Sequence, residues 1–289
     1  MARTGPEKEH DQHTALNVVV QHHPQDVRDN VQEACRRVAM DLLPIEVKVN
    51  IEGDVAAALS ALGGSTGPMK TRRIWFAEDR NGVAEGRVPL LDGGVIVRFR
   101  SGGGPDDLTV KLRPCAREQL IGRFSAPFEA KPFTYKIEED WSERHRVLAA
   151  SLVHVHPPGV LSNAVMPGGD PAASIDAVQD QFLRVCANGV RLDGLVALGP
   201  VLSTKVDDVA LDDLEVDLEK WTVGGLGFLE VSTRVKPEDE DDVEKFIASA
   251  ERKQRRLEDA VREHGVALSE HPESKTRRVL TALAGARQG

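Results

Sequence analysis

The sequence predicts an α+β fold, in which a mostly antiparallel barrel of about eight strands is flanked by helices. Several short segments alternate strictly between apolar and charged residues, as 45–52 does, and side chains alternate between the two faces of a strand. The charges are also segregated, since two neighbouring segments (95–100 and 108–113) carry cations and a later one (214–219) carries acids. A barrel with a charged interior explains this segregation. An antiparallel sheet with a solvated outer face is the alternative.

The elements of the first half follow in order along the chain. A helix is predicted over 26–43, because apolar residues recur at helical spacing and Pro44 follows its end. Asp54 can cap a short helix over 55–62. Strands are expected near 45–52, 71–78, 95–100, 108–113, 131–141 and 146–156, separated by Gly and Pro clusters.

The second half continues with strands and helices. Segment 157–173 is rich in Pro, Gly and small residues, which predicts a long loop or an inserted flap. Helices are expected over 174–187 (capped by Ser174), 237–264 and 273–284, and strands near 195–206, 214–222 and 227–235. The chain is therefore expected to divide into an N-terminal extension with one helix, residues 1–44, and a barrel domain, residues 45–289.

Composition limits the classes of function. The net charge of −9 argues against non-specific binding of duplex nucleic acid through a basic face, although it leaves room for a local basic cavity. No apolar run approaches the roughly 20 residues of a membrane helix, and the first residues lack the apolar core of a signal peptide. Cys35, Cys115 and Cys186 are too few and too far apart for a disulfide framework. A cytoplasmic protein with no membrane partner is expected.

Five motifs carry a family resemblance. They are Glu46-Val-Lys48-Val-Asn50, Arg72-Arg73-Ile-Trp75-Phe76-Ala-Glu78, Gly93-Gly94-Val-Ile-Val-Arg98-Phe-Arg100, Leu108-Thr-Val-Lys111-Leu112 and Gly224-Gly-Leu-Gly227-Phe-Leu-Glu230-Val-Ser232. In this order they resemble the motifs of the CYTH superfamily, the triphosphate tunnel metalloenzymes, over about residues 45 to 265. The resemblance implies an eight-stranded tunnel that binds a triphosphate compound together with Mg²⁺ or Mn²⁺.

The sequence departs from the family pattern where the family binds its metal. Lys48 stands where the family has the second glutamate of its first motif, and Asn50 replaces the lysine of that motif. Ser232 replaces the last glutamate of the closing motif, and the expected Lys-x-Arg reads Lys205-Val206-Asp207. These changes affect the expected metal site more than the expected fold.

Cations on shared strand faces are the candidate substrate ligands. Phosphoryl transfer depends on positioning and on neutralising charge, and Arg binds phosphate bidentately whereas Lys acts as a point charge. The candidates are Arg73, Arg98, Arg100, Lys111, Arg113, Lys136 and Lys205. Solvated surface charges are the alternative interpretation.

Carboxylates on other strands are the candidate metal ligands. Glu46, Asp217, Glu219 and Glu230 offer oxygen atoms, which suit Mg²⁺ or Mn²⁺ better than zinc. The resemblance makes Glu46, Glu230 and Lys48 the candidate catalytic residues. Lys48 either neutralises a bound phosphate directly or pairs with a carboxylate of a decayed metal site. For the acids of 215–219, an ordinary acidic strand edge is the alternative.

The sequence therefore predicts binding of a triphosphate-containing compound (a nucleotide, thiamine triphosphate or inorganic polyphosphate) in a charged tunnel. Metal-dependent hydrolysis is the first reaction to consider and nucleotidyl cyclisation the second. A non-catalytic phosphate- or nucleotide-binding module with a decayed metal site is the competing class, and a structural barrel for protein contacts is a third. A homodimer stays open. His154 and His156 share a strand face at a chelating spacing, but with no third ligand nearby we expect edge histidines.

Overall fold

A computed structural model of the protein describes residues 42–65, 67–142, 145–187, 189–238, 242–271 and 273–287. All of the helix predicted over 26–43 except its last two residues, and with it nearly all of the N-terminal extension, lies outside these residues. The strands are β1 (Ile45–Ile51), β2 (Met69–Asp79), β3 (Val95–Ser101), β4 (Asp106–Leu112), β5 (Phe128–Ala130), β6 (Phe133–Ser142), β7 (His145–His156), β8 (Leu195–Leu211), β9 (Leu214–Val223) and β10 (Leu226–Val235). The helices are α2 (Val55–Ala61), α3 (Arg80–Ala84), α4 (Pro89–Asp92), α5 (Ser162–Val165), α6 (Ala177–Cys186), α7 (Val243–Glu263) and α8 (Lys275–Gly285), with short 3-10 turns at Arg117–Gln119, Gly122–Phe124 and Ala172–Ser174.

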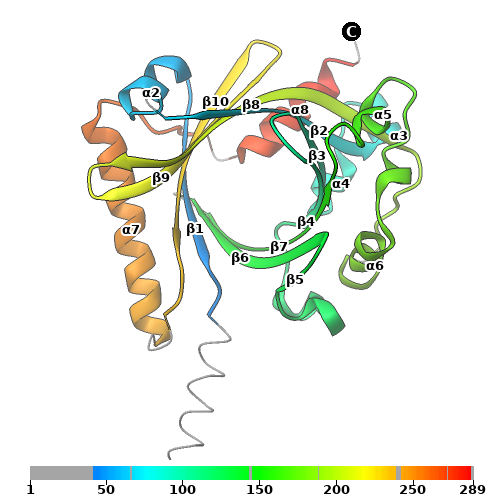
Figure 1. The fold of residues 1–289 in the computed structure, drawn as a ribbon, viewed down its shortest axis with the longest axis horizontal. Coiled ribbons are helices and arrows are strands. Elements are labelled where there is room, and N and C mark those ends of the chain that lie inside the picture. Colours follow the sequence, from blue (N-terminus) through cyan, green and yellow to red (C-terminus); the bar gives the residue numbers. More distant parts are fainter. Residues whose placement is uncertain are drawn as a thin grey trace, which may run out of the picture.

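The strands form one sheet that closes on itself as a barrel (Figure 1). Their order is β1-β10-β9-β8-β2-β3-β4-β7-β6-β5, and a further pairing of β1 with β6 closes the ring, which leaves β5 paired to β6 alone. The α+β barrel was predicted correctly, but the number and direction of its strands need correction. Among the described residues nine strands form the ring, and β1 and β6 run parallel. An odd number of strands cannot alternate in direction all the way round, so one neighbouring pair has to be parallel.

The apolar faces of the strands point outward and are covered by helices. On one side Val47 and Val49 of β1 belong to a cluster that includes Leu59 of α2 and Leu257 of α7. On the other side β3, β4, β6 and β7 pack against Phe182 of α6. Figure 1 shows α7 and α6 on opposite outer sides of the ring. Because the outer face is apolar and covered, the alternate charged residues point inward, and the alternative of a solvated outer face is wrong.

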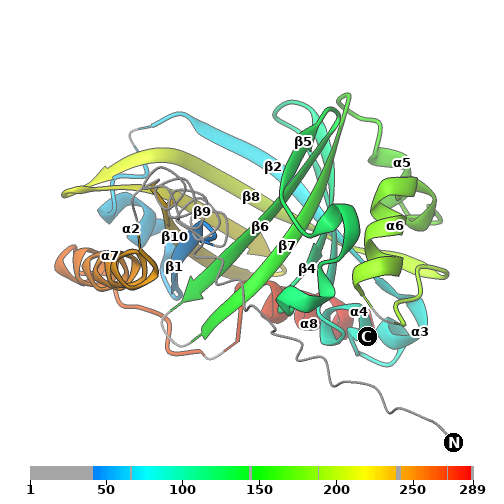
Figure 2. The ribbon, with the colours of Figure 1, turned by 90° about the horizontal axis from the view of Figure 1, so that it is seen from below.

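Helix α8 closes one end of the barrel interior. Its residues Val279 and Leu280 are buried against Phe76, Trp221 and Phe228, which stand on β2, β9 and β10. Figure 2 shows α8 beneath the strands and beside α4, whose Asp92 forms an ion pair with Arg277 of α8. An apolar helix face thus fills the end of a cavity that is otherwise charged.

Two predicted helix starts shift by a few residues. The helix predicted from Ser174 begins at Ala177, since the Asp176 side chain accepts a hydrogen bond from Val178 N and forms a capping box with Gln179. The helix predicted from 237 begins at Val243, because Asp242 caps it through Lys245 N. The predicted loop 157–173 contains the short helix α5. In the part of the chain that the structure describes, no helix is long and apolar enough to cross a membrane.

Candidate anion-binding tunnel

A cavity of about 490 Å³ lies inside the barrel, next to α8. Its charged lining comes from the inward faces of β1, β3, β4, β6, β9 and β10 and from the first turn of α8. The residues with fixed charge that meet there from these elements are Lys48, Arg98, Lys111, Arg113, Asp140, Glu219, Glu230, Lys275 and Arg277. Strand alternation therefore brings part of the predicted set into one cavity, namely the cations Arg98, Lys111 and Arg113 and the acids Glu219 and Glu230.

Asp140 of β6 is the centre of one ion-pair cluster. Its carboxylate is 1% exposed and accepts from Lys48 Nζ at 2.8 Å and from Lys111 Nζ at 3.1 Å, while Arg113 Nε lies 2.6 Å away. Burial alone would raise the pKa of Asp140, but these three cations lower that pKa well below its ordinary value. Asp140 was not among the predicted site residues, although it shares the alternate face of β6 with Lys136.

Lys48 joins two carboxylates. Its Nζ lies 2.7 Å from Glu46 Oε2 as well as 2.8 Å from Asp140 Oδ1. Burial would lower the pKa of Lys48, but the charges of Glu46 and Asp140 raise it above its ordinary value. The side chain is therefore a fixed cation. Lys48 therefore makes the carboxylate contacts that one of its two predicted roles requires, and its contact with a phosphate stays a prediction.

Three carboxylates beside Lys48 could hold a metal ion. Oxygen atoms of Glu46, Glu138 and Asp140 all lie within 4.8 Å of one another. Oxygen donors of this kind suit Mg²⁺ or Mn²⁺. However, the same carboxylates contact ammonium groups, since Lys48 bridges Glu46 and Asp140 and Lys111 lies 3.7 Å from Glu138. A divalent ion at this cluster would have to share its ligands with Lys48.

A second lysine lies between two of the predicted metal ligands. Lys275, at the start of α8, is 7% exposed, and its Nζ lies 3.2 Å from Glu219 and 3.3 Å from Glu230. The ammonium also stacks on the Trp221 ring at 4.0 Å. Burial raises the pKa of Glu219, but the charge of Lys275 and the hydroxyl of Ser203, which donates at 2.7 Å, bring it below its ordinary value. The position of Lys275 on a terminal helix gave no signal in the sequence.

Arg98 of β3 is a half-buried cation with few partners. Its hydrogen bond to the Thr109 hydroxyl is long, 3.5 Å, and its Nε is buried without an acceptor among the described residues. Burial and the nearby charge of Arg100 lower the pKa of Arg98 to about 10. No carboxylate lies within 4.0 Å of the guanidinium among the residues that the structure describes. A buried charged donor without an acceptor is costly, so this guanidinium is suited to binding an anion in the cavity.

Two further arginines, Arg72 and Arg100, share a single carboxylate. Arg100 Nε donates to both carboxylate oxygens of Asp107 at 2.9 Å, and Arg72 donates to the same carboxylate at 2.8 Å. Both guanidinium groups therefore share one acid, while Arg98 has none. We call Arg72, Arg98 and Arg100 the arginine wall. Arg100, one of the predicted substrate ligands, thus faces inward, but it is not among the residues that line the 490 Å³ cavity.

Arg73 is a correction to the predicted set. It is exposed, whereas Arg72 contacts inward-facing Asp107 and Ile74 is buried against α8. Alternation along β2 therefore puts Arg73 on the outer face and Arg72 on the inner one. Lys136 shares the inner face of β6 with Asp140, but its side chain is exposed.

The predicted metal ligands are not gathered at one point. Glu46 belongs to the Lys48 cluster, whereas Glu219 and Glu230 bind Lys275. Asp217 instead accepts from Lys205 Nζ at 2.8 Å. Lys205 also forms an ion pair with Asp207, so this predicted phosphate ligand already has two acids.

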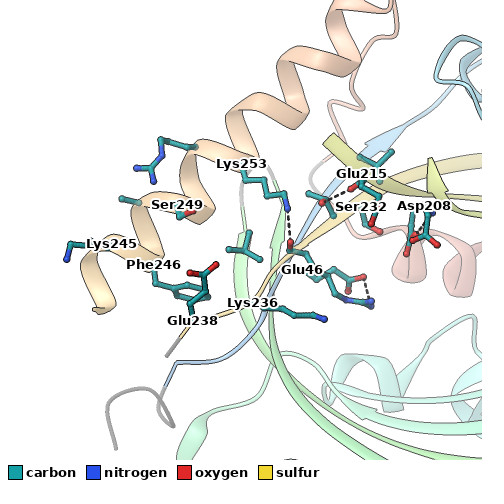
Figure 3. Close-up of a pocket in the computed structure, with 17 residues that line it drawn as sticks. Glu46, Asp208, Glu215, Ser232, Lys236, Glu238, Lys245, Phe246, Ser249 and Lys253 are labelled. Atoms are coloured by element: carbon teal, nitrogen blue, oxygen red, sulfur yellow. Dashed lines mark hydrogen bonds and ion pairs between the residues drawn. The ribbon is translucent and has the colours of Figure 1, made fainter. Parts of the chain in front are cut away.

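A larger pocket, of about 900 Å³, lies between the first turns of α7 and the ends of β9 and β10 (Figure 3). Its charges are mixed, with Lys236 and Lys245 beside Glu215 and Glu238. Glu46 lines it, and the Glu46–Lys48 ion pair separates it from the tunnel cavity. This pocket was not predicted, and it holds none of the arginine wall.

The two histidines of β7 pack on each other outside this site. Their rings are 3.9 Å apart, and Phe133 lies 4.4 Å from the ring of His154. Burial lowers the pKa of both imidazoles. Among the described residues, neither belongs to a group of three ligands that could hold a metal, as expected for edge histidines.

The structure is similar to that of a proposed adenylyl cyclase from Hippeastrum, which reveals a dominant triphosphatase activity. The TM-score is 0.51 at 14% identity, and the match covers 83% of this chain and 96% of that chain. Weaker matches include a proposed adenylate cyclase from Bacillus halodurans (TM-score 0.44, 12% identity, 82% and 98% covered) and the PH1819 protein from Pyrococcus horikoshii (0.42, 14%, 82% and 99%). No protein-family model and no curated protein matches the sequence. The protein has the CYTH-type tunnel fold that its motifs suggested. At such low identity, the similarity shows the fold alone.

Proposed function

We propose that the protein binds a compound with a triphosphate or longer polyphosphate chain inside its tunnel. The single observation that supports this most is the arginine wall, in which three guanidinium groups have one carboxylate between them. Phosphate oxygens accept bidentate hydrogen bonds from Arg and carry the compensating charge. Lys111 and Arg113 stand on the neighbouring strand or just beyond its end, so a chain of phosphates can reach them from Arg98.

Enzymatic hydrolysis is a second candidate function. The cluster of Glu46, Glu138 and Asp140 supports it, since this donor set would suit Mg²⁺ or Mn²⁺, which neutralises phosphate charge in phosphoryl transfer. In that case Arg98 would bind phosphate oxygens, and Lys111, which contacts Glu138 and Asp140, would lie beside the ion. Against this candidate, Lys48 already bridges two of the three ligands. A nucleotidyl cyclase would need the same residues, and none of the described residues assigns a base-binding site.

Isothermal titration with tripolyphosphate, ATP and thiamine triphosphate tests the proposal, with and without Mg²⁺ or Mn²⁺. We expect one binding site per chain for at least one of these compounds. The matched control is inorganic sulfate at the same ionic strength, because sulfate offers one tetrahedral anion without the phosphate chain that the proposal requires. A parallel assay of released phosphate separates an enzyme from a binding module. Heats that never exceed those of sulfate would refute the proposed function.

A further inference from the structure

Both carboxylate clusters of the tunnel are neutralised by lysine side chains of the protein. Lys48 lies between Glu46 and Asp140 at 2.7 and 2.8 Å, and Lys275 lies between Glu219 and Glu230 at 3.2 and 3.3 Å. These are ordinary lengths for charge-assisted hydrogen bonds. Each ammonium thus occupies the point between two acids at which a dissolved cation would otherwise bind.

Both lysine side chains are largely withdrawn from water together with their acids. The side chain of Lys48 is 15% exposed and that of Lys275 is 6% exposed. A buried carboxylate without a cation is costly, so without either lysine the carboxylates beside it would bind a cation from solution. With the lysines in place, these carboxylates are already neutralised.

A divalent ion at the first cluster would also meet repulsion. Lys48, Lys111 and Arg113 all lie within 3.1 Å of Asp140, so an ion bound there would sit close to three positive charges. The carboxylates could bind the ion only by giving up their bonds to these cations. The donor set has the right chemistry for Mg²⁺, but its surroundings favour the ammonium.

We infer that Lys48 is a built-in counter-cation, and that the tunnel binds its polyphosphate ligand without a divalent metal. This inference rests on the proposed function. Lys275 does the same for Glu219 and Glu230 and thereby keeps the second pair of acids from repelling the ligand. The arginine wall is then free to bind phosphate oxygens directly.

The test is isothermal titration of the full chain with sodium tripolyphosphate, once in EDTA and once in excess Mg²⁺. We expect affinities that agree within about threefold, after correction for the Mg²⁺ that the ligand itself binds. Binding that appears only with Mg²⁺ would overturn the inference and leave the proposed function standing. A complete lack of binding under both conditions would overturn both.

A second measurement does not depend on the polyphosphate. Mn²⁺ titration followed by electron paramagnetic resonance reports how much free ion disappears. We expect the natural protein to bind no more Mn²⁺ than Lys131→Glu, a control with the same charge change at an exposed turn. Lys48→Glu should bind Mn²⁺ about tenfold more tightly or better, since it replaces the ammonium by a further carboxylate. If Lys48→Glu fails to fold, Lys48→Met tests the same point. Tight Mn²⁺ binding by the natural protein would contradict the inference.

Discussion

Asp140→Asn tests how much the tunnel depends on its buried ion pairs. In the natural protein one carboxylate at 1% exposure faces Lys48, Lys111 and Arg113 within 3.1 Å, and these cations are only 15–21% exposed. Removing one partner of a buried pair typically costs about 3–5 kcal/mol, because the remaining charge is left uncompensated. The amide keeps the size of the side chain, so little of the loss comes from packing. We expect the free energy of unfolding to fall by roughly 3 kcal/mol or more.

Urea denaturation followed by circular dichroism measures this change. With a slope of about 3 kcal/mol per molar urea, the midpoint should fall by roughly 1 M or more. Asp213→Asn is the matched control, because Asp213 is 69% exposed and its pair with Arg256 should contribute less than about 1 kcal/mol. Tripolyphosphate should stabilise Asp140→Asn more than the natural protein, since the three cations would then lack their acid. Equal midpoints for the two variants would refute the reasoning.

Three further predictions concern the same cavity. Arg98→Ala should weaken tripolyphosphate binding by tenfold or more in isothermal titration, since a charge-assisted hydrogen bond contributes about 1.5–3 kcal/mol. The control Lys253→Ala on α7 should leave the affinity unchanged, and similar losses in the two variants would argue against the arginine wall. Lys275→Ala should lower the urea midpoint as Asp140→Asn does, because Glu219 loses its ammonium; an unaltered midpoint would show that this ion pair is of no consequence. The pKa values of Asp140 and Glu219 are lowered in the folded protein, so their contribution to stability is complete above their ordinary pKa, near 4, and is lost as pH falls below it. The urea midpoint should therefore drop between pH 5 and pH 3. The drop should be smaller in Asp140→Asn.

The direction of the charged faces could be predicted from the sequence. In β1 and β4 the apolar residues alternate so strictly that one face had to be buried, and the segregated charges indicated that the other face was enclosed too. The closure of the barrel could not be predicted in the same way. Alternation is a property of one strand, whereas the parallel pairing of β1 with β6 depends on how many strands lie between them.

The choice between Arg72 and Arg73 shows where alternation fails. Ile74 and Phe76 are buried against α8 inside the barrel, while Trp75 packs against the outer core. Both faces of β2 are therefore apolar at this point, and the pattern does not say which is inside. The cause is α8, which fills one end of a charged tunnel with apolar side chains.

The strands that line the cavity were predicted, but the pairings between their charged residues were not. Lys48 stood out because it replaces an expected acid, and Arg98 because it shares a face with other cations. Asp140 and Lys275 were missed, since one falls outside the recognised motifs and the other stands on a helix whose position over the tunnel is set by tertiary packing. Ion pairs between residues more than 50 positions apart, such as Lys275 with Glu219, have no local signature.

The most direct test of the account is a crystal structure of the protein grown with tripolyphosphate in the presence of EDTA. The account predicts phosphate density inside the barrel, within hydrogen-bond distance of Arg98 and Lys111, with Lys48 still between Glu46 and Asp140. Density confined to the mixed-charge pocket beneath α7, or to exposed lysines, would contradict the central claim that the tunnel is the anion-binding site.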